Sequence, residues 1–433
     1  SYTSRKTSAQ PECSADTPIR TAVPLFGGSD DVGEVDREVN GTLRSGVMTS
    51  STPDPDGGVV SVRTAADPPR IRFGGVDILR ALAVLTVVYS HISYFLVDDL
   101  GTPWWLIDVV TFVVVEHGGL NHHLSFVGVA FFMILTGLVA TASVVRNSPR
   151  AFLVGRAARL LPVFWLSVLA AIVLVRLGVN GMFSQTVGIS NAEAAMSFVL
   201  GGFFVRPEVV VLGVTWTLAV QGVFYLYAVS MRRVLASRPV LVPVVGAVVC
   251  WLVLLYTDLV PFEYTIPMVD KVAATLPTVF LGQIVYLAYA RLASWRALVV
   301  GGLVQFAVIQ YATTIDAFHV GQQGHLWTVL VLVVAVVLVA PTDTAFGRSR
   351  VVHWLATRSY TIYLVHTLVL YRTYSLVEPH LGATVAVLVF ALITGLLSDL
   401  VYRYVETPAA RWIARHWSGR GRSPAPTRGT QAN

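Results

Sequence analysis

From Gly75 onward the sequence alternates long apolar runs with short polar breaks, and this alternation constrains the fold more than any other feature. A helix of about 20 apolar residues crosses the roughly 30 Å hydrocarbon core of a bilayer. The composition agrees, because 55% of the 433 residues are hydrophobic and only 13% are charged, whereas about a quarter of the residues in a soluble domain are charged. We therefore expect an all-α polytopic membrane protein with about ten spans. They cover roughly residues 76–97, 126–145, 160–177, 214–231, 240–257, 272–290, 297–314, 326–341, 359–377 and 383–404, and a weaker apolar run at 192–205 is assigned to a loop.

Basic residues gather in every second connection between these runs. Twelve arginines lie on one side of the predicted array, whereas the other side has four basic residues, Arg176, Arg206, Lys271 and Arg372. By the positive-inside rule the arginine-rich side is cytoplasmic, and an even number of spans places both termini there. The twelve arginines are Arg146, Arg150, Arg156, Arg159, Arg232, Arg233, Arg238, Arg291, Arg296, Arg348, Arg350 and Arg358.

Two polar segments flank the predicted membrane domain, which we place at residues 73–417. Residues 1–72 are rich in Ser, Thr, Pro, Asp and Gly and show no apolar periodicity, which is typical of a disordered tail. They contain no apolar core of a secretory signal. Residues 418–433 have a similar composition, and we expect them to be disordered too. The net charge of +6 comes from arginines at helix ends and does not indicate nucleic-acid binding.

The first predicted span places ionisable side chains in an apolar stretch, DILRALAVLTVVYSH, residues 77–91. Arg80 and His91 are eleven residues apart, which puts them on one helix face, about 16 Å apart along the axis. Asp77 shares this face. An ionisable residue at membrane depth indicates a functional site by default. A neutral histidine that only hydrogen-bonds between helices is the structural alternative.

Further polar side chains recur at membrane depth in later spans. Arg156 and Arg159 lie one turn apart and can grip a phosphate bidentately, although any membrane protein also carries arginines as topology markers. In TWTLAVQGVFYL, which begins with Thr215 and Trp216, Gln221 and Tyr225 are four residues apart and can hydrogen-bond along the helix.

Three further stretches complete the pattern. SYTIYLVH, residues 359–366, places Tyr363 and His366 on one helix face. Gly128 and Gly137 are expected to let helix backbones approach closely. Glu406, just before the helix-breaking Pro408, is expected to pair with a nearby arginine.

The histidine pair His122–His123 in the loop after the first span raises the question of a metal. We expect no metal site, because no HExxH motif and no carboxylate at a fixed offset accompanies the pair. The two cysteines, Cys13 and Cys250, are too few for a disulfide framework or a metal-cysteine cluster.

Taken in order, these stretches resemble the acyltransferase 3 family of integral membrane acyltransferases. The family opens with an arginine, ten residues and a histidine, as at Arg80 and His91. Each motif is weak alone, but six in order on the predicted spans are specific. The other matches are Phe131 to Gly137 for FFxxSG, with one extra residue and Thr for Ser; Arg156, Arg159, Leu160 and Pro162 for RxxRL(x)P; Trp216 to Gln221 for W(S/T)LxxE; Ser359, Tyr360, Tyr363, Leu364 and His366 for SYxxYLxH; and Glu406 with Pro408 for the terminal ExP.

The resemblance implies a multi-pass enzyme of a bacterial-type plasma membrane that moves an acyl group, often acetyl, from acyl-CoA to a hydroxyl. The acceptor would be a sugar, a glycolipid or a small natural product, and no bound cofactor is expected beyond the donor acyl-CoA. His91 and Arg80 are the catalytic candidates, with His91 as the base that deprotonates the acceptor. Direct transfer and a covalent acyl-histidine both remain open. The substrate-binding candidates are Arg156, Arg159, Trp216, Gln221, Tyr225, Tyr363 and His366, with the arginines on the CoA phosphates and the others around the pocket or the oxyanion.

One position departs from the family pattern. The family commonly has Glu where this chain has Gln221, and an amide can hydrogen-bond but cannot hold a charge. An acid–base role at this position is therefore in doubt, and a distinct substrate branch is an open possibility.

A transporter or flippase is the main alternative, because polar residues at mid-membrane also suit permeation. The sequence shows no internal repeat and no matching pair of Gly/Pro-broken spans, which are typical of secondary transporters. A structural or sensory membrane protein is a third possibility. Dependence of a product on acyl-CoA separates an enzyme from both.

Overall fold

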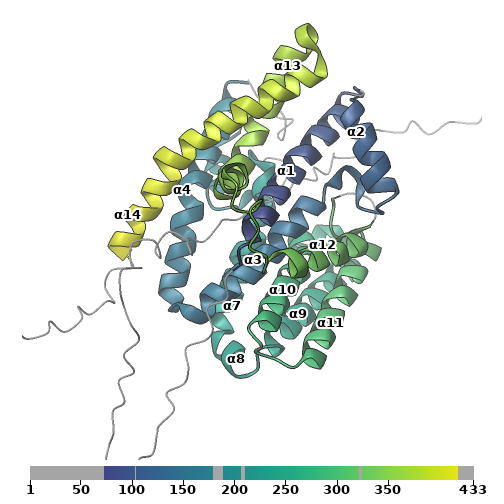
Figure 1. Cartoon of the computed structure of the whole chain (residues 1–433), viewed down its shortest axis with the longest axis vertical. Coiled ribbons are helices and arrows are strands. Elements are labelled where there is room, and N and C mark those ends of the chain that lie inside the picture. The colour runs from purple at the N-terminus through teal and green to yellow at the C-terminus, as the bar shows by residue number, and fades with distance from the viewer. Residues whose placement is uncertain (1–72, 103, 179–188, 206–209, 321–323, 418–433) are drawn as a thin grey trace, which may run out of the picture.

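The computed structural model describes residues 73–102, 104–178, 189–205, 210–320 and 324–417. These residues form an all-helical bundle without strands (Figure 1). The tails predicted to be disordered, 1–72 and 418–433, lie outside the described residues. The α-helices are α1 Val76–Tyr94, α2 Trp105–Val110, α3 Val127–Arg146, α4 Pro149–Arg176, α5 Asn191–Ser197, α6 Gly202–Val205, α7 Trp216–Ser230, α8 Arg232–Ser237, α9 Leu241–Leu259, α10 Val269–Tyr289, α11 Trp295–Thr314, α12 His325–Val339, α13 Arg350–Val401 and α14 Thr407–Trp417. Short turns of other helix types lie at Phe95–Asp99, Thr111–Glu116, His122–Leu124, Gly213–Thr215, Phe262–Tyr264 and Tyr402–Glu406.

Within the described part of the chain, seven helical stretches are long and apolar enough to cross a membrane. The predicted all-α, multi-pass class is therefore supported. The helices α7 and α12 overlap two further predicted spans, but each has 15 residues, which at about 1.5 Å per residue is shorter than the hydrocarbon core. The number of about ten spans and the cytoplasmic position of both termini stay predictions.

The longest of the seven stretches, Arg350–Trp417, is a hairpin. Its main helix α13 is interrupted at Gly382, whose φ of 78° and ψ of 166° are not helical. Asp399 in the second half accepts hydrogen bonds from Trp354 and Arg358 in the first half, at 3.2 and 2.6 Å. The two halves therefore run antiparallel, as the two spans predicted at 359–377 and 383–404 require. In Figure 1 the yellow second half runs from the tip of the hairpin to α14.

The start of α4 differs from the prediction. The third span was expected at about residue 160, but α4 begins at Pro149, because the Ser148 side chain caps it and proline occupies its first turn. Only two residues connect α3 to α4. Arg156 and Arg159, expected near a connection, therefore lie inside a long helix.

The loop expected at 192–205 is partly helical. It contains α5 and α6, and α5 starts with a capping box in which Ser190 and Glu193 satisfy each other's backbone N–H groups. Ser190 and Glu193, three residues apart, are a capping signal in the sequence, whereas the weak hydropathy of this run does not indicate a helix.

The close helix packing predicted for the glycines of α3 is confirmed. A side chain on Gly137 would collide with the carbonyl oxygen of Val279 in α10, and one on Gly282 of α10 would collide with that of Ile134. Two reciprocal glycines thus bring the backbones of α3 and α10 into contact, which is the small-residue packing of membrane helices.

The outer surface of α13 explains the apolar composition. Leu388, Leu392, Leu396 and Leu400 follow each other at four-residue spacing and are 52 to 64% exposed. Soluble proteins rarely leave such a stripe uncovered. Its natural environment is lipid.

Candidate active site

Two histidines from distant parts of the chain meet inside the bundle. His91 in α1 is 5% exposed and His366 in α13 is fully buried. His366 Nε2 lies 3.0 Å from His91 Nδ1, and the ring centroids are 4.8 Å apart. From the sequence, His91 was predicted to be a base and His366 to bind the substrate. The packing of α1 against α13 joins them into one unit.

Backbone carbonyls one turn earlier orient both rings. His91 Nδ1 lies 3.1 Å from the oxygen of Val87, and His366 Nδ1 lies 3.2 Å from that of Ile362. His91 Nε2 is buried and has no hydrogen-bond partner among the described residues. An unsatisfied buried polar atom costs about 1–3 kcal/mol. This nitrogen is therefore the atom of the pair whose hydrogen-bonding capacity is unused among the described residues.

The turn of α1 that carries Val87 is held in place by α3. A side chain on Gly128 would collide with the Val87 side chain and approach its backbone nitrogen to 3.0 Å. Glycine at this position lets α3 approach the segment that orients His91, which confirms the packing role predicted for Gly128.

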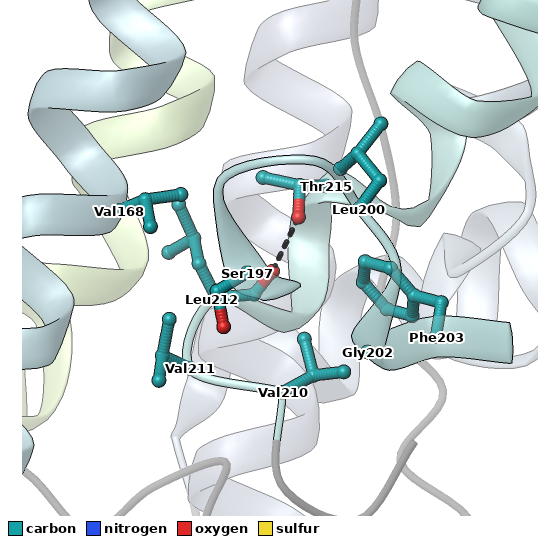
Figure 2. Close-up of a pocket in the computed structure, with 9 residues that line it drawn as sticks. All are labelled: Val168, Ser197, Leu200, Gly202, Phe203, Val210, Val211, Leu212 and Thr215. Carbon is teal, nitrogen blue, oxygen red and sulfur yellow. Dashed lines mark hydrogen bonds between the residues drawn. The ribbon is translucent and has the colours of Figure 1, made fainter. Parts of the chain in front are cut away.

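Tyr363 connects the histidine pair to the segment before α7. Its ring centroid lies 5.7 Å from that of His366, and its hydroxyl donates to the carbonyl of Val214. The next residue, Thr215, lines a pocket of about 210 Å³ that includes space open to the surroundings. Figure 2 shows this pocket, with the Thr215 hydroxyl donating to Leu212 at 2.8 Å. The other lining residues are Val168, Ser197, Leu200, Gly202, Phe203, Val210 and Val211.

Arg80 lies on the same buried face of α1 as His91, three turns earlier. It is 6% exposed, and its Nη1 is 3.7 Å from Asp77 Oδ1. The other oxygen of Asp77 is 3.2 Å from His353 Nδ1. The predicted shared face of Asp77, Arg80 and His91 is confirmed, so a positive charge lies about 16 Å along the helix from the histidine pair.

A second polar group joins α4 to α7. The guanidinium of Arg156 lies 5.4 Å from the ring centroids of both Phe152 and Tyr225. The Tyr225 hydroxyl donates to Gln221 Oε1 at 3.2 Å, as the four-residue spacing predicted. Stacking on aromatic rings fixes the plane of a guanidinium and suits it to bidentate binding of a phosphate. Arg159, the other candidate of α4, is only partly buried.

Comparisons with known proteins identify the family. The family model for the acyltransferase domain called acyltransferase 3 matches residues 73–403. The chain belongs to the acyltransferase 3 family. Nodulation protein 10 of Rhizobium leguminosarum bv. viciae is 30% identical over 169 residues, which cover 35% of this chain and 41% of that protein's length. No solved structure matches the chain.

The resemblance drawn from the ordered motifs is thereby confirmed. The matched region contains all the predicted site residues of α1, α4, α7 and α13. In this acyltransferase 3 chain those residues fall into two groups. One is the histidine pair with Tyr363, and the other is Arg156 with the Gln221–Tyr225 pair, while Arg80 lies beside Asp77.

Lys271 is a buried cation that the motifs did not single out. It is 1% exposed, and its Nζ lies 4.4 Å from the ring centroid of Trp216, a cation–π distance. Its neighbour Asp270 accepts a hydrogen bond from His319 at 2.6 Å. The sequence could have indicated Lys271 as a candidate, because it is one of only two lysines and stands at the start of an apolar run.

The histidines of the loop before α3 have a local role. The Ser93 hydroxyl lies 2.7 Å from His123 Nδ1, and Asp98 lies 3.2 Å from its Nε2. Burial and the adjacent His122 lower the pKa of His123, against an opposing effect of Asp98. Within the described ranges, no three His, Cys, Asp or Glu side chains cluster as metal ligands would.

Glu406 is buried and accepts a hydrogen bond from Thr361 at 2.5 Å. This contact joins the turn that follows α13 to the SYTIYLVH segment in the first half of α13. The arginine pairing expected for Glu406 stays a prediction.

Proposed function

We propose that this protein transfers an acyl group, acetyl in the simplest case, from acyl-CoA to a hydroxyl of a sugar, a glycolipid or a small natural product. The reaction would take place within a bacterial-type plasma membrane. The observation that carries the proposal is the state of His91, whose Nε2 is buried without a partner among the described residues while its Nδ1 is held by two neighbours. An imidazole that is fixed through Nδ1 and whose Nε2 makes no other hydrogen bond is suited to general-base catalysis.

In the proposed reaction His91 Nε2 takes the proton of the acceptor hydroxyl as the hydroxyl oxygen attacks the thioester carbonyl carbon. The carbon–sulfur bond then breaks, and the leaving CoA sulfur takes that proton from His91. The products are an ester and free CoA, and the histidine returns to its starting state. The alternative route through an acyl-histidine would use the same nitrogen as a nucleophile.

The donor would lie between the two polar groups of the site. A CoA ester carries its phosphates and its thioester at opposite ends of one extended arm. Arg80 lies about 16 Å along α1 from His91. Arg156 and Arg159 lie in α4, one helical turn apart. We therefore assign the phosphates to these three arginines, with bidentate contacts from their guanidinium groups.

Two buried N–H donors are suited to the oxyanion that forms when the thioester is attacked. Trp216 Nε1 and Gln221 Nε2 have no hydrogen-bond partner among the described residues. An amide can donate such a bond, whereas the ionised carboxylate common at this family position cannot. In this proposal Gln221 provides a hydrogen-bond donor where the family commonly has the negative charge of Glu. Tyr225 and Tyr363 shape the surrounding pocket.

Acyl transfer is tested with membrane vesicles from cells that express the protein, supplied with radiolabelled acetyl-CoA. Mass spectrometry of lipids, glycans and secreted metabolites from deletion and complemented strains then identifies the acceptor. We expect wild-type vesicles to form a labelled product and His91→Ala vesicles to lose at least 100-fold in rate, the usual size of a general-base contribution.

His117→Ala is the matched control, because His117 is an exposed histidine of the loop before α3. It should leave the rate unchanged. Full activity of His91→Ala at normal expression would remove His91 from catalysis. If the deletion changes where a compound is found but not its mass, the protein acts as a transporter instead.

A further inference from the structure

We propose that His366 is a positioning residue that holds His91 in the tautomer with its proton on Nδ1, so that Nε2 is left as the base. This inference rests on the proposed function. It changes the role expected for His366 from binding substrate to acting through His91.

The donor and acceptor roles follow from the contacts of the pair. A carbonyl oxygen can only accept, so His366 Nδ1, 3.2 Å from the oxygen of Ile362, carries a hydrogen. A neutral imidazole has one N–H and one lone pair, so His366 Nε2 is an acceptor. His91 Nδ1 lies 3.0 Å from that acceptor and 3.1 Å from the Val87 oxygen. It faces two acceptors and must therefore carry the hydrogen of its own ring.

Both rings are neutral in this arrangement. The pair is buried among apolar helices, where a cation is costly, and two adjacent cations at this distance would repel strongly. With the proton of His91 on Nδ1, the lone pair lies on Nε2, which is the nitrogen without a partner among the described residues. The three contacts thus describe one chain of hydrogen bonds, in which His91 Nδ1 donates to His366 and His366 donates to the Ile362 carbonyl, with the Val87 carbonyl as a second acceptor for His91.

The chain also explains why a second histidine is useful at this position. The Val87 carbonyl belongs to the same helix as His91 and moves with it. His366 comes from α13 and holds the ring from another element, which limits rotation about the side-chain bonds. A fixed ring keeps Nε2 directed at the substrate as the proton is transferred.

Three substitutions at His366 test this role. In His366→Gln the terminal amide oxygen can occupy the place of Nε2 and still accept from His91. In His366→Asn the shorter amide can replace Nδ1 but cannot reach His91, and His366→Leu removes both groups. The assay is acetyl transfer in vesicles, with kcat and the KM for acetyl-CoA measured separately per mole of folded protein.

We expect His366→Gln to retain most of the wild-type kcat. His366→Asn and His366→Leu should lose roughly 10- to 100-fold in kcat, the usual effect of removing the group that orients a functional histidine. The KM for acetyl-CoA should stay near that of the wild type, because the phosphate-binding arginines are untouched. Equal loss in the Gln, Asn and Leu variants, or no loss in His366→Leu, would overturn the proposal.

A direct observation of the tautomer keeps the test independent of folding defects. Nitrogen-15 solid-state NMR of protein labelled at histidine distinguishes Nδ1–H from Nε2–H rings, and the signal lost in His91→Gln identifies His91. We expect Nδ1–H in the wild type and in His366→Gln. An Nε2–H signal from wild-type His91 would contradict the inference. If His91→Ala is inactive while His366→Leu is fully active, the proposed function stands and this inference fails. If His91→Ala is active, the proposed function itself fails.

Discussion

Single residues decide whether the helices of this acyltransferase 3 family member can approach closely enough to build the site. His91, the proposed base, is positioned by the turn of α1 at Val87, which packs on Gly128, and α3 in turn packs closely against α10 through Gly137 and Gly282. The atoms nearest to these glycines belong to Val87, Val279 and Ile134 rather than to the histidine pair. Their effect is to set the distances between helices.

Replacement of Gly137 by alanine should destabilise the protein. The added carbon would collide with the Val279 carbonyl of α10, and a close backbone contact cannot yield without moving a helix. We expect a loss of about 1–3 kcal/mol, the usual cost of overpacking, seen as a lower thermal midpoint in detergent. Gly222→Ala is the matched control, because nothing lies within 4 Å of that position. It should be neutral or stabilising by up to about 1 kcal/mol. Equal midpoints for the two variants would contradict the packing argument.

The loop histidine His123 should make stability depend on pH. Its pKa is lowered by burial, so the folded state favours the neutral ring. The stabilisation is complete above the unfolded pKa of about 6.5 and is lost as the pH falls towards the lower folded pKa. We expect the thermal midpoint to drop between pH 7.5 and 5.5, and His123→Gln to reduce that drop. The exposed His117→Gln should leave it as in the wild type. A pH dependence unaffected by His123→Gln would assign the effect to other groups.

At the scale of elements, the α13 hairpin brings His366 to His91. Asp399 holds its two halves together, since one oxygen accepts from Trp354 and Arg358 while the other lies 2.7 Å from Arg403 Nε. Thr361 and Glu406 add a contact between the first half and the turn that follows α13. The first half of α13 also packs against α1 and bonds to Leu160 of α4 through the Tyr360 hydroxyl.

Asp399→Asn should therefore weaken the hairpin, because the amide keeps the shape of the side chain but loses the charge that two arginines share. We expect a loss of about 1 kcal/mol, since the group is partly exposed. Asp343→Asn is the control, because its pair with Arg348 is 65 to 68% exposed and should contribute little. Thermal midpoints in detergent compare the two variants. A larger effect at Asp343 would show that the hairpin contact is not the stabilising one.

At the scale of the whole molecule, the arginine distribution predicts which end of the bundle faces the cytoplasm. Ser237, at the end of α8 before α9, and Glu263, in the turn after α9, are exposed and serve as reporter positions. In a Cys13→Ser background, Glu263→Cys should react with an impermeant maleimide in intact cells. Ser237→Cys should react only after the cells are permeabilised. The reverse pattern would invert the predicted orientation, and with it the side from which the proposed donor, acyl-CoA, would reach Arg80.

Much of this architecture could be predicted from the sequence. Apolar runs predict helices at membrane depth because a bilayer requires every backbone group to be paired within its own segment. The spacing within one helix predicts shared faces, and the Asp77–Arg80 contact and the Gln221–Tyr225 hydrogen bond agree with it. Helix starts were less certain, as at Pro149, because capping decides them locally while hydropathy is averaged over many residues.

Sequence alone determined that this chain is a helical membrane protein with the ordered motifs of the acyltransferase 3 family, since periodicity and motif order are properties of the chain itself. Only the tertiary structure decided that His91 meets His366, that Lys271 lies over Trp216, and that Tyr363 reaches the Val214 carbonyl. These contacts join residues of different helices. No spacing along the chain specifies them, because they depend on which faces pack together and on how closely glycines let the helices approach.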